Sequence, residues 1–194
     1  MTSLHKLLLP LLFVLPAMVS AQDNNEELLD WNEEKRLQWN DFKSKPDPRS
    51  DAAASTTTYL GIEYSFSNNV ILYKIACRFS KNKSWGLHQT EYILAHEQGH
   101  FDIAEIFARK LHMKMKNYKF NRSTYRQDLK KIYDEILDEK EMWQNTYDEE
   151  TRHSIDRKKQ AAWLEKIAQE LTKTKDYANY SYTEPSLASQ TPVP

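Results

Sequence analysis

Residues 94–105 read "LAHEQGHFDIAE" and place His96, Glu97 and His100 in the order H-E-x-x-H. On a helix each residue advances by about 100°, so the two histidines lie about 40° apart on one face, one turn from each other. Two neutral imidazoles arranged in this way can converge on one metal ion, and the pattern favours zinc. Glu97 lies beside this face, where its carboxylate can take a proton from water activated by the ion. The spacing therefore predicts a zinc site with Glu97 as a catalytic general base.

The alternative interpretation is an ordinary helix on which both histidines are packed or solvated. The apolar side chains of the segment oppose it, because they fall on the same side as His96 and His100 and turn both imidazoles into the protein. These side chains are Ile93, Ile103, Ala104, Phe107 and Leu111. Buried imidazoles need polar partners, and a metal ion is a suitable one. Gly99, inside the motif, predicts a close approach by another backbone or by a substrate.

A catalytic zinc ion needs a third protein ligand, and the motif does not supply one. Glu105 lies about 180° around the helix from His96, so its carboxylate faces away from the ion. One known pattern places a third histidine six residues after His100, but that position holds Ile106. The third ligand is therefore expected from a later part of the chain.

We predict His153 as that third metal ligand. Helical spacing over residues 146–172 places His153 on the side of the helix that faces the core. The apolar members of that side are Leu164, Ile167, Ala168 and Leu171.

Four neighbours of His153 carry related predictions. Glu149 and Glu150 are the main alternatives for the third ligand, because a glutamate from a later helix completes the zinc site of some hydrolases. Tyr147 and Arg152 are candidate hydrogen-bond donors to a developing oxyanion. We assign the catalytic role to Tyr147.

The elements that must position these residues begin with two strands. Residues 57–66 and 70–79 alternate between two sets of side chains, the period of a half-buried strand. Turn-forming residues at 67–69 separate them, so the two runs predict a hairpin. One face of the second run carries Ile71, Tyr73, Ile75, Cys77 and Phe79. A short strand or two is also expected within residues 31–48, ended by Pro46 and Pro48.

Helical spacing follows over residues 87–118, 123–144 and 146–172. Strands followed by helices predict the α+β class. We expect a short antiparallel β-sheet followed by three long helices, of which the first carries the zincin-like motif.

The first 21 residues have the parts of a secretory signal peptide. Lys6 provides a positive start, residues 7–19 are almost wholly apolar, and Ala21 precedes the expected cleavage site. The apolar run is shorter than the roughly 20 residues that span a bilayer. The sequence therefore predicts an exported protein, periplasmic or extracellular, with no membrane attachment after cleavage.

The remaining chain is predicted to form one metallohydrolase domain over residues 22–174. The segment 175–194 is polar and ends in prolines, so we expect a disordered tail there. Cys77 is the only cysteine, which excludes an internal disulfide and a cysteine-rich zinc site. The 27 Lys and Arg residues nearly balance the 28 Asp and Glu residues, so no basic field favours nucleic acid.

Three stretches resemble a known family: "LQWNDFKSKPD", "SWGLHQTEYILAHEQGHFDIAEIFARKL" and "YDEETRHSIDRKKQAAW". They resemble a family of secreted bacterial proteins, domain of unknown function 922, described as zinc-dependent proteases with a zincin-like H-E-x-x-H motif. The resemblance covers most of the mature chain and implies that His96, Glu97 and His100 are the zinc-site residues. The Tyr-Asp…Thr-x-His block of the family maps onto Tyr147, Asp148, Thr151 and His153.

The chain departs from the family pattern at Ser44 and Ser154, where glycine is usual. Neither change removes a proposed ligand. The protease description itself rests on the motif, so the resemblance adds little about the substrate.

Two functions fit these observations. The first is a secreted zinc-dependent metallohydrolase, most simply a peptidase that acts on a peptide or protein, although other amides such as cell-wall peptides suit the same chemistry. The second is a non-catalytic envelope protein that binds zinc or a partner through the same fold. Glu97 favours the first, because a structural zinc site does not need that carboxylate.

Overall fold

The structure is a computed structural model that describes residues 26–67 and 70–180. These residues form a three-stranded antiparallel sheet, a small two-stranded sheet and three long helices, which confirms the predicted α+β class. The larger sheet has the order β1-β4-β3, with bounds Leu28–Asp30 for β1, Thr58–Ser67 for β3 and Val70–Ser80 for β4. The smaller sheet pairs β2 (Ala54–Ser55) with β5 (Trp85–Gly86).

Strands β3 and β4 form the predicted hairpin. They pair from Thr58 opposite Phe79 to Ser67 opposite Val70, and residues 68–69 of the predicted turn lie outside the described residues. The apolar face predicted for β4 is buried against the helices, as the low exposure of its members shows. These are Ile71, Tyr73, Ile75, Cys77 and Phe79.

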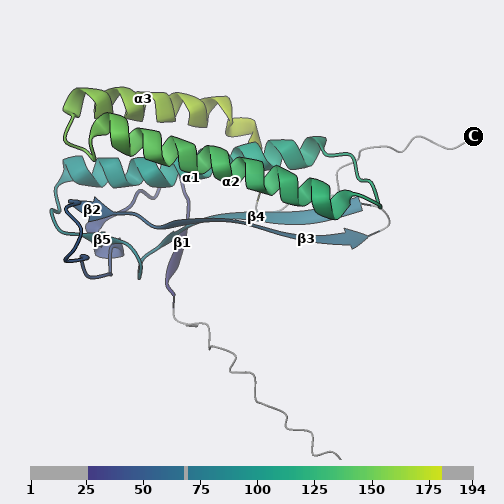
Figure 1. The fold of residues 1–194 in the computed structure, drawn as a ribbon, viewed down its shortest axis with the longest axis horizontal. Coiled ribbons are helices and arrows are strands. Elements are labelled where there is room, and N and C mark those ends of the chain that lie inside the picture. The colour runs from purple at the N-terminus through teal and green to yellow at the C-terminus, as the bar shows by residue number, and fades with distance from the viewer. Residues whose placement is uncertain (1–25, 68–69, 181–194) are drawn as a thin grey trace, which may run out of the picture.

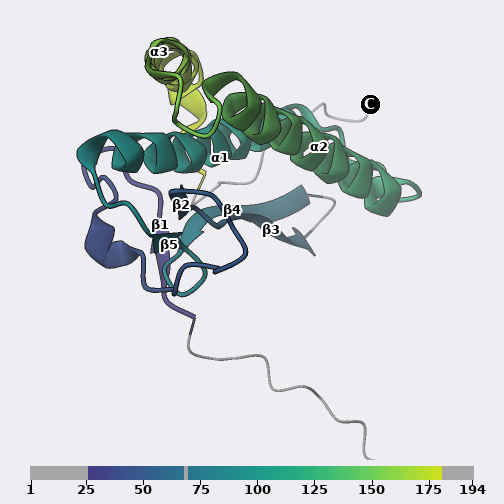
Figure 2. The same ribbon diagram turned by 60° about the vertical axis from the view of Figure 1, so that its left-hand side comes forward.

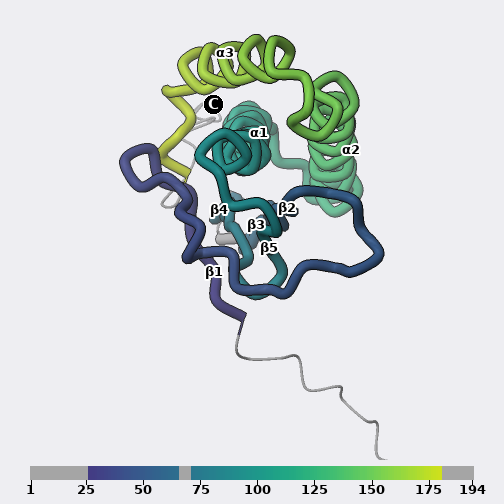
Figure 3. Tube along the Cα trace, turned by 90° about the vertical axis from the view of Figure 1, so that its left-hand side faces the viewer, coloured from purple at the N-terminus to yellow at the C-terminus, as the bar shows by residue number. Residues whose placement is uncertain are grey.

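The three helices lie on one face of the larger sheet (Figure 1). Helix α1 (Glu91–Asn117) lies between the sheet and the other two, α2 (Tyr125–Thr151) and α3 (Arg157–Lys173), as Figures 2 and 3 show. The side chain of Thr90 caps α1 by accepting a hydrogen bond from the Ile93 amide. Because α1 is covered on several sides, its buried residues are not confined to one stripe, and polar side chains are enclosed with the apolar ones.

The predicted bounds of the second and third helices were wrong. Helix α2 passes through residue 145 without interruption and ends at Thr151, and α3 begins only at Arg157. The chain turns because Arg152 adopts the left-handed conformation and its amide returns to the carbonyls of Asp148 and Glu149. Asp156 then starts α3 by accepting a hydrogen bond from the Lys159 amide, a standard helix N-cap.

The N-terminal strand also differs from its prediction. It lies at Leu28–Asp30, and within residues 31–48 the chain forms a 3₁₀ helix at Trp39–Asp41. The amide of Gln38 donates to the side chain of Asp41, which closes this tight turn locally.

At the other end, the described chain continues past the predicted domain boundary at residue 174. A 3₁₀ helix occupies Lys175–Tyr177, and Tyr180 is buried. The predicted signal peptide, residues 1–21, and residues 181–194 of the predicted tail lie outside the described residues. Among the helices that the structure describes, none combines the length and apolar character needed to cross a membrane.

Candidate metal site

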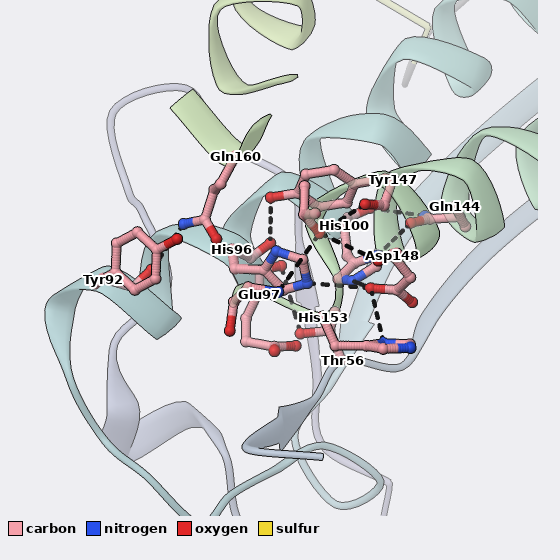
Figure 4. A network of polar contacts seen from close by, with 12 residues as sticks. Thr56, Tyr92, His96, Glu97, His100, Gln144, Tyr147, Asp148, His153 and Gln160 are labelled. Atoms are coloured by element: carbon pink, nitrogen blue, oxygen red, sulfur yellow. Dashed lines mark hydrogen bonds and ion pairs between the residues drawn. The ribbon is translucent and has the colours of Figure 1, made fainter. Parts of the chain in front are cut away.

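Helices α1 and α2 bring together two imidazoles and one carboxylate (Figure 4). His96 Nε2 and His100 Nε2 each lie 3.1 Å from Oδ1 of Asp148. Metal bonds of about 2.0–2.1 Å in a tetrahedral site would set ligand atoms about 3.3 Å apart, close to this spacing. The three side chains therefore form a group that could hold a metal ion. The spacing on α1 predicts the two histidines, whereas Asp148 was not among the predicted ligands.

Gln144, one turn before Asp148 on α2, determines which nitrogen of His100 carries a proton. Its amide nitrogen donates to the His100 carbonyl over 2.9 Å, which leaves its amide oxygen 2.5 Å from His100 Nδ1. An amide oxygen can only accept, so Nδ1 donates to it. In a neutral ring, Nε2 then presents a lone pair to the carboxylate, which is also an acceptor. Positive charge is required between them, as a second proton on His100 or as a metal ion. This donor set therefore fits a cation.

Asp148 and His100 each favour the charged form of the other. Burial alone would raise the pKa of Asp148, but the hydrogen bonds from His100 and His96 outweigh it and hold that pKa well below its usual range. Burial lowers the pKa of His100, and the hydrogen bond and charge of Asp148 more than compensate, so the pKa of His100 is raised. Asp148 is therefore ionised and attracts positive charge to the two imidazoles.

Tyr147 holds both imidazoles in place from the α2 side. Its ring stacks on His96 with centroids 4.5 Å apart and meets the ring of His100 edge-on at 5.0 Å. Its hydroxyl donates to the His96 carbonyl over 3.3 Å. A Cβ added to Gly99 would lie only 2.6 Å from the Tyr147 hydroxyl oxygen. The close approach predicted at Gly99 is therefore made by a tyrosine side chain.

This placement bears on the catalytic role predicted for Tyr147. The side chain is completely buried, and burial, followed by the charge of Glu97, raises its pKa far above the ordinary tyrosine value. The hydroxyl therefore keeps its proton, but it points at the backbone of α1, and Tyr147 is not among the residues that line the cavity beside the metal site. Its role as an oxyanion donor stays a prediction, and the contacts described here support the positioning of the imidazoles.

Glu97 faces a cavity of about 480 Å³ that adjoins His96, His100 and Asp148. Its side chain is buried, and within the described part of the chain its Oε2 atom has no hydrogen-bond partner. His96 Nδ1 is likewise buried and unpaired among these residues. Buried polar atoms are almost always hydrogen-bonded, and exceptions tend to mark sites of chemistry. The carboxylate is thus held beside the candidate metal group without being neutralised by a protein donor.

His153 reaches the same cavity by a route that the sequence did not predict. It follows the end of α2 in a turn where Arg152, His153 and Ser154 all have positive φ, at 51°, 50° and 71°. Its side chain is 67% exposed, and its Nδ1 lies 3.5 Å from Asp148 Oδ1. The expectation that His153 lies on the buried face of a continuous helix was therefore wrong, because the helix ends before it. Its assignment as a metal ligand stays a prediction.

The other ligand alternatives lie away from the three-residue group. Glu149 and Glu150 are both exposed, and Glu150 accepts a hydrogen bond from the indole of Trp163 over 2.8 Å. Arg152 is exposed and does not line the cavity. Glu105, which the angular count excludes, is buried and bonded to Arg109.

Sequence reasoning missed Asp148 and Gln144 because it ended a helix at residue 144. A signal was present, since apolar residues recur every seven positions at Leu129, Ile136 and Trp143, and Tyr147 follows one turn later. Reading one helix through to residue 151 would have placed residues 144 and 148 one turn apart beside that stripe. The contact of this face with the H-E-x-x-H helix is a tertiary feature.

Fold and site together define an α+β protein with a His-His-Asp group that could bind a metal ion. The model of the family of bacterial proteins of unknown function, DUF922, matches residues 34–154, and the chain belongs to that family. The match includes the whole of the candidate site and ends at Ser154, before α3. The description of the family states no protease activity. No curated protein and no solved structure matches the chain.

Proposed function

We propose that this protein is an exported zinc-dependent hydrolase that cleaves peptide bonds. One observation carries the proposal: Glu97, whose buried Oε2 has no hydrogen-bond partner among the described residues, adjoins the His96, His100 and Asp148 group in a single cavity. A purely structural metal site needs neither a cavity nor a free carboxylate. The choice of zinc follows from the two imidazoles and one carboxylate, a ligand set that also occurs in catalytic zinc sites.

The chain's own residues have distinct roles in this reaction. His96, His100 and Asp148 would hold the ion, which when bound would polarise the scissile carbonyl and make a water molecule acidic. Glu97 accepts a proton from that water as the oxygen of the water bonds to the carbonyl carbon. The same carboxyl group then returns the proton to the nitrogen as the carbon–nitrogen bond breaks.

The small sheet offers a means of holding an extended substrate. Ala53 O accepts hydrogen bonds from the amides of Leu87 and His88, so the polar groups of Ala53 face β5. Strand geometry directs the N–H and C=O of the next residue, Ala54, to the opposite edge. Among the described strands β2 pairs only with β5, and both of its residues line the cavity. A peptide backbone can therefore add along this edge beside Glu97.

The proposal is tested by the variant Glu97→Gln with metal analysis and a peptide-cleavage assay. The amide keeps the size of the side chain but cannot take the proton, so hydrolysis should fall by at least about 100-fold. Because Glu97 is not a member of the ligand group, bound zinc should remain near one ion per chain.

A matched control is Glu141→Gln, which alters an exposed carboxylate of the same cavity. It should leave catalysis close to the wild-type rate. Full activity in Glu97→Gln would contradict the mechanism. Zinc binding by the wild-type protein with no cleavage of peptides or cell-wall amides would instead favour a non-catalytic envelope protein.

A further inference from the structure

The cavity beside the metal group has a strand edge on one side and helix α2 on the other. Residues 52–58 form the first wall, and all of them are alanine, serine or threonine. Thr57 O accepts from the Ser80 amide, so Thr57 faces β4 and the polar groups of Thr58 face the free edge. Ala54 on β2 also faces a free edge, so outward-facing backbone groups occur in both strands of this wall.

Tyr133 closes this edge two residues further along β3. Its hydroxyl donates to the carbonyl of Leu60 over 2.6 Å, so the side chain crosses from α2 to the outer edge of the strand. Leu60 lies two residues after Thr58, so its backbone N–H and C=O face the same edge of β3. The Leu60 carbonyl would therefore be the next acceptor for an added peptide strand. A peptide that pairs with this wall therefore meets a barrier at Tyr133.

Lys140 lies on α2 between this barrier and the metal group. Among the residues that the structure describes, it is the only lysine or arginine in the cavity lining, and it is half-buried. Elsewhere on α2, Lys130 and Lys131 pair with carboxylates four residues later. Lys140 makes no ion pair with any carboxylate that the structure describes, although Glu141 lies beside it in the cavity lining. A half-buried ammonium without a protein counter-charge is suited to binding an anion from outside the chain.

Helix geometry sets where that anion would lie on a substrate. Lys140 precedes Asp148 by two turns, or about 12 Å along the helix axis at 1.5 Å per residue. An extended peptide advances about 3.3 Å per residue, so this length corresponds to three or four residues. Helical side chains also lean toward the N-terminus, which directs Lys140 toward the closed end at Tyr133.

We propose that Lys140 binds a carboxylate of the substrate three or four residues from the scissile bond. The substrate class is a peptide with small side chains along the strand edge and a negative charge at the closed end of the cavity. That charge is supplied by the C-terminal carboxylate of the peptide or by an Asp or Glu side chain. This inference rests on the proposed peptidase function, because it takes the metal group as the point of cleavage.

The test measures the binding of synthetic peptides to the zinc-loaded Glu97→Gln protein, which binds substrate without consuming it. Three peptides of alanine, serine and threonine are compared: one with a free C-terminal carboxylate, its C-terminal amide, and an amide that carries one glutamate near its end. The free acid should bind roughly five- to tenfold more tightly than the plain amide. If the glutamate peptide binds as tightly as the free acid, a side-chain carboxylate is sufficient. If the glutamate peptide binds only as weakly as the plain amide, the site recognises the C-terminal carboxylate.

Adding Lys140→Ala to this protein should abolish the preference for the carboxylate, whereas Lys140→Arg should keep it. Lys131→Ala, an exposed lysine on the same helix, is the matched control and should keep it too. The inference would be overturned if the protein with Lys140→Ala kept its full preference for the carboxylate. It would also be overturned if all three peptides bound equally to the Glu97→Gln protein that retains Lys140. Cleavage by the wild-type protein is assayed separately, so the peptidase function can stand even where the role of Lys140 fails.

Discussion

Helix α1 carries two clusters of buried polar side chains that differ in how their hydrogen bonds are satisfied. In the first, around His96 and Glu97, Nδ1 of the histidine and Oε2 of the glutamate are unpaired among the described residues, and a cavity adjoins both. In the second, Glu105 accepts from Arg109 Nε over 2.7 Å and from the hydroxyl of Tyr180. Arg109 also donates to the carbonyl of Leu171 over 2.8 Å.

The difference separates a site for chemistry from a structural connection, although both lie on one helix. Burial raises the pKa of Glu105, and the hydrogen bonds of Tyr180 and Arg109 only partly offset that effect. Its carboxylate is used internally, to join α1 to the end of the described chain. Glu97 is also buried but has a cavity in front of it. A buried acid is therefore a candidate for catalysis when its protein partners are missing and a ligand can reach it.

The largest effect expected from this comparison is the loss of stability in Glu105→Gln. The substitution leaves the guanidinium of Arg109 buried without a counter-charge, which should lower the free energy of unfolding by about 3–5 kcal/mol. Denaturant unfolding of the metal-free protein measures it. Glu135→Gln, whose partner Lys114 is solvent-accessible, should change the same quantity by less than about 1 kcal/mol. Equal losses of unfolding free energy in the two variants would show that the buried Glu105–Arg109 pair stabilises the fold no more than a solvent-accessible pair does.

The next largest effect concerns the other cluster, around His96 and Glu97, and is a change in metal affinity. Asp148→Ala removes a carboxylate that faces both imidazoles, so zinc affinity should fall by more than about 100-fold, beyond the range typical of outer partners. Secondary structure should be retained, as circular dichroism can show. His153→Ala is the informative companion, because His153 is exposed and lies 3.5 Å from Asp148. If His153→Ala loses zinc and Asp148→Ala keeps it, the third ligand is His153 instead.

The smallest effect tests the packing behind the metal group. A methyl group on Gly99 would lie 2.6 Å from the Tyr147 hydroxyl oxygen, so Gly99→Ala should cost about 1–3 kcal/mol of stability. Removing that oxygen in Tyr147→Phe leaves the nearest ring atoms at 3.0 and 3.1 Å, and the cost of Gly99→Ala should then be smaller. A double-mutant cycle by thermal unfolding gives the coupling between the two residues. Additive effects would show that the tyrosine is not the obstacle.

Local periodicity explains the parts of the fold that were predicted correctly. Alternation along residues 70–79 identified the buried face of β4, and the angular count on α1 brought His96 and His100 together and excluded Glu105. These inferences need only the fixed geometry of one strand or one helix. The break after α2 was harder to predict, because three consecutive non-glycine residues, Arg152, His153 and Ser154, adopt positive φ there.

The sequence by itself determined the two imidazoles, the adjacent glutamate and the α+β order of elements. Only the tertiary structure decided that Asp148 faces those imidazoles, that Gln144 sets the proton on His100, and that Glu105 is satisfied while Glu97 is not. The physical reason is that ligand convergence depends on the packing of α2 against α1. Residues separated by about fifty positions meet through that packing, and no periodicity within either helix specifies the distance between their atoms.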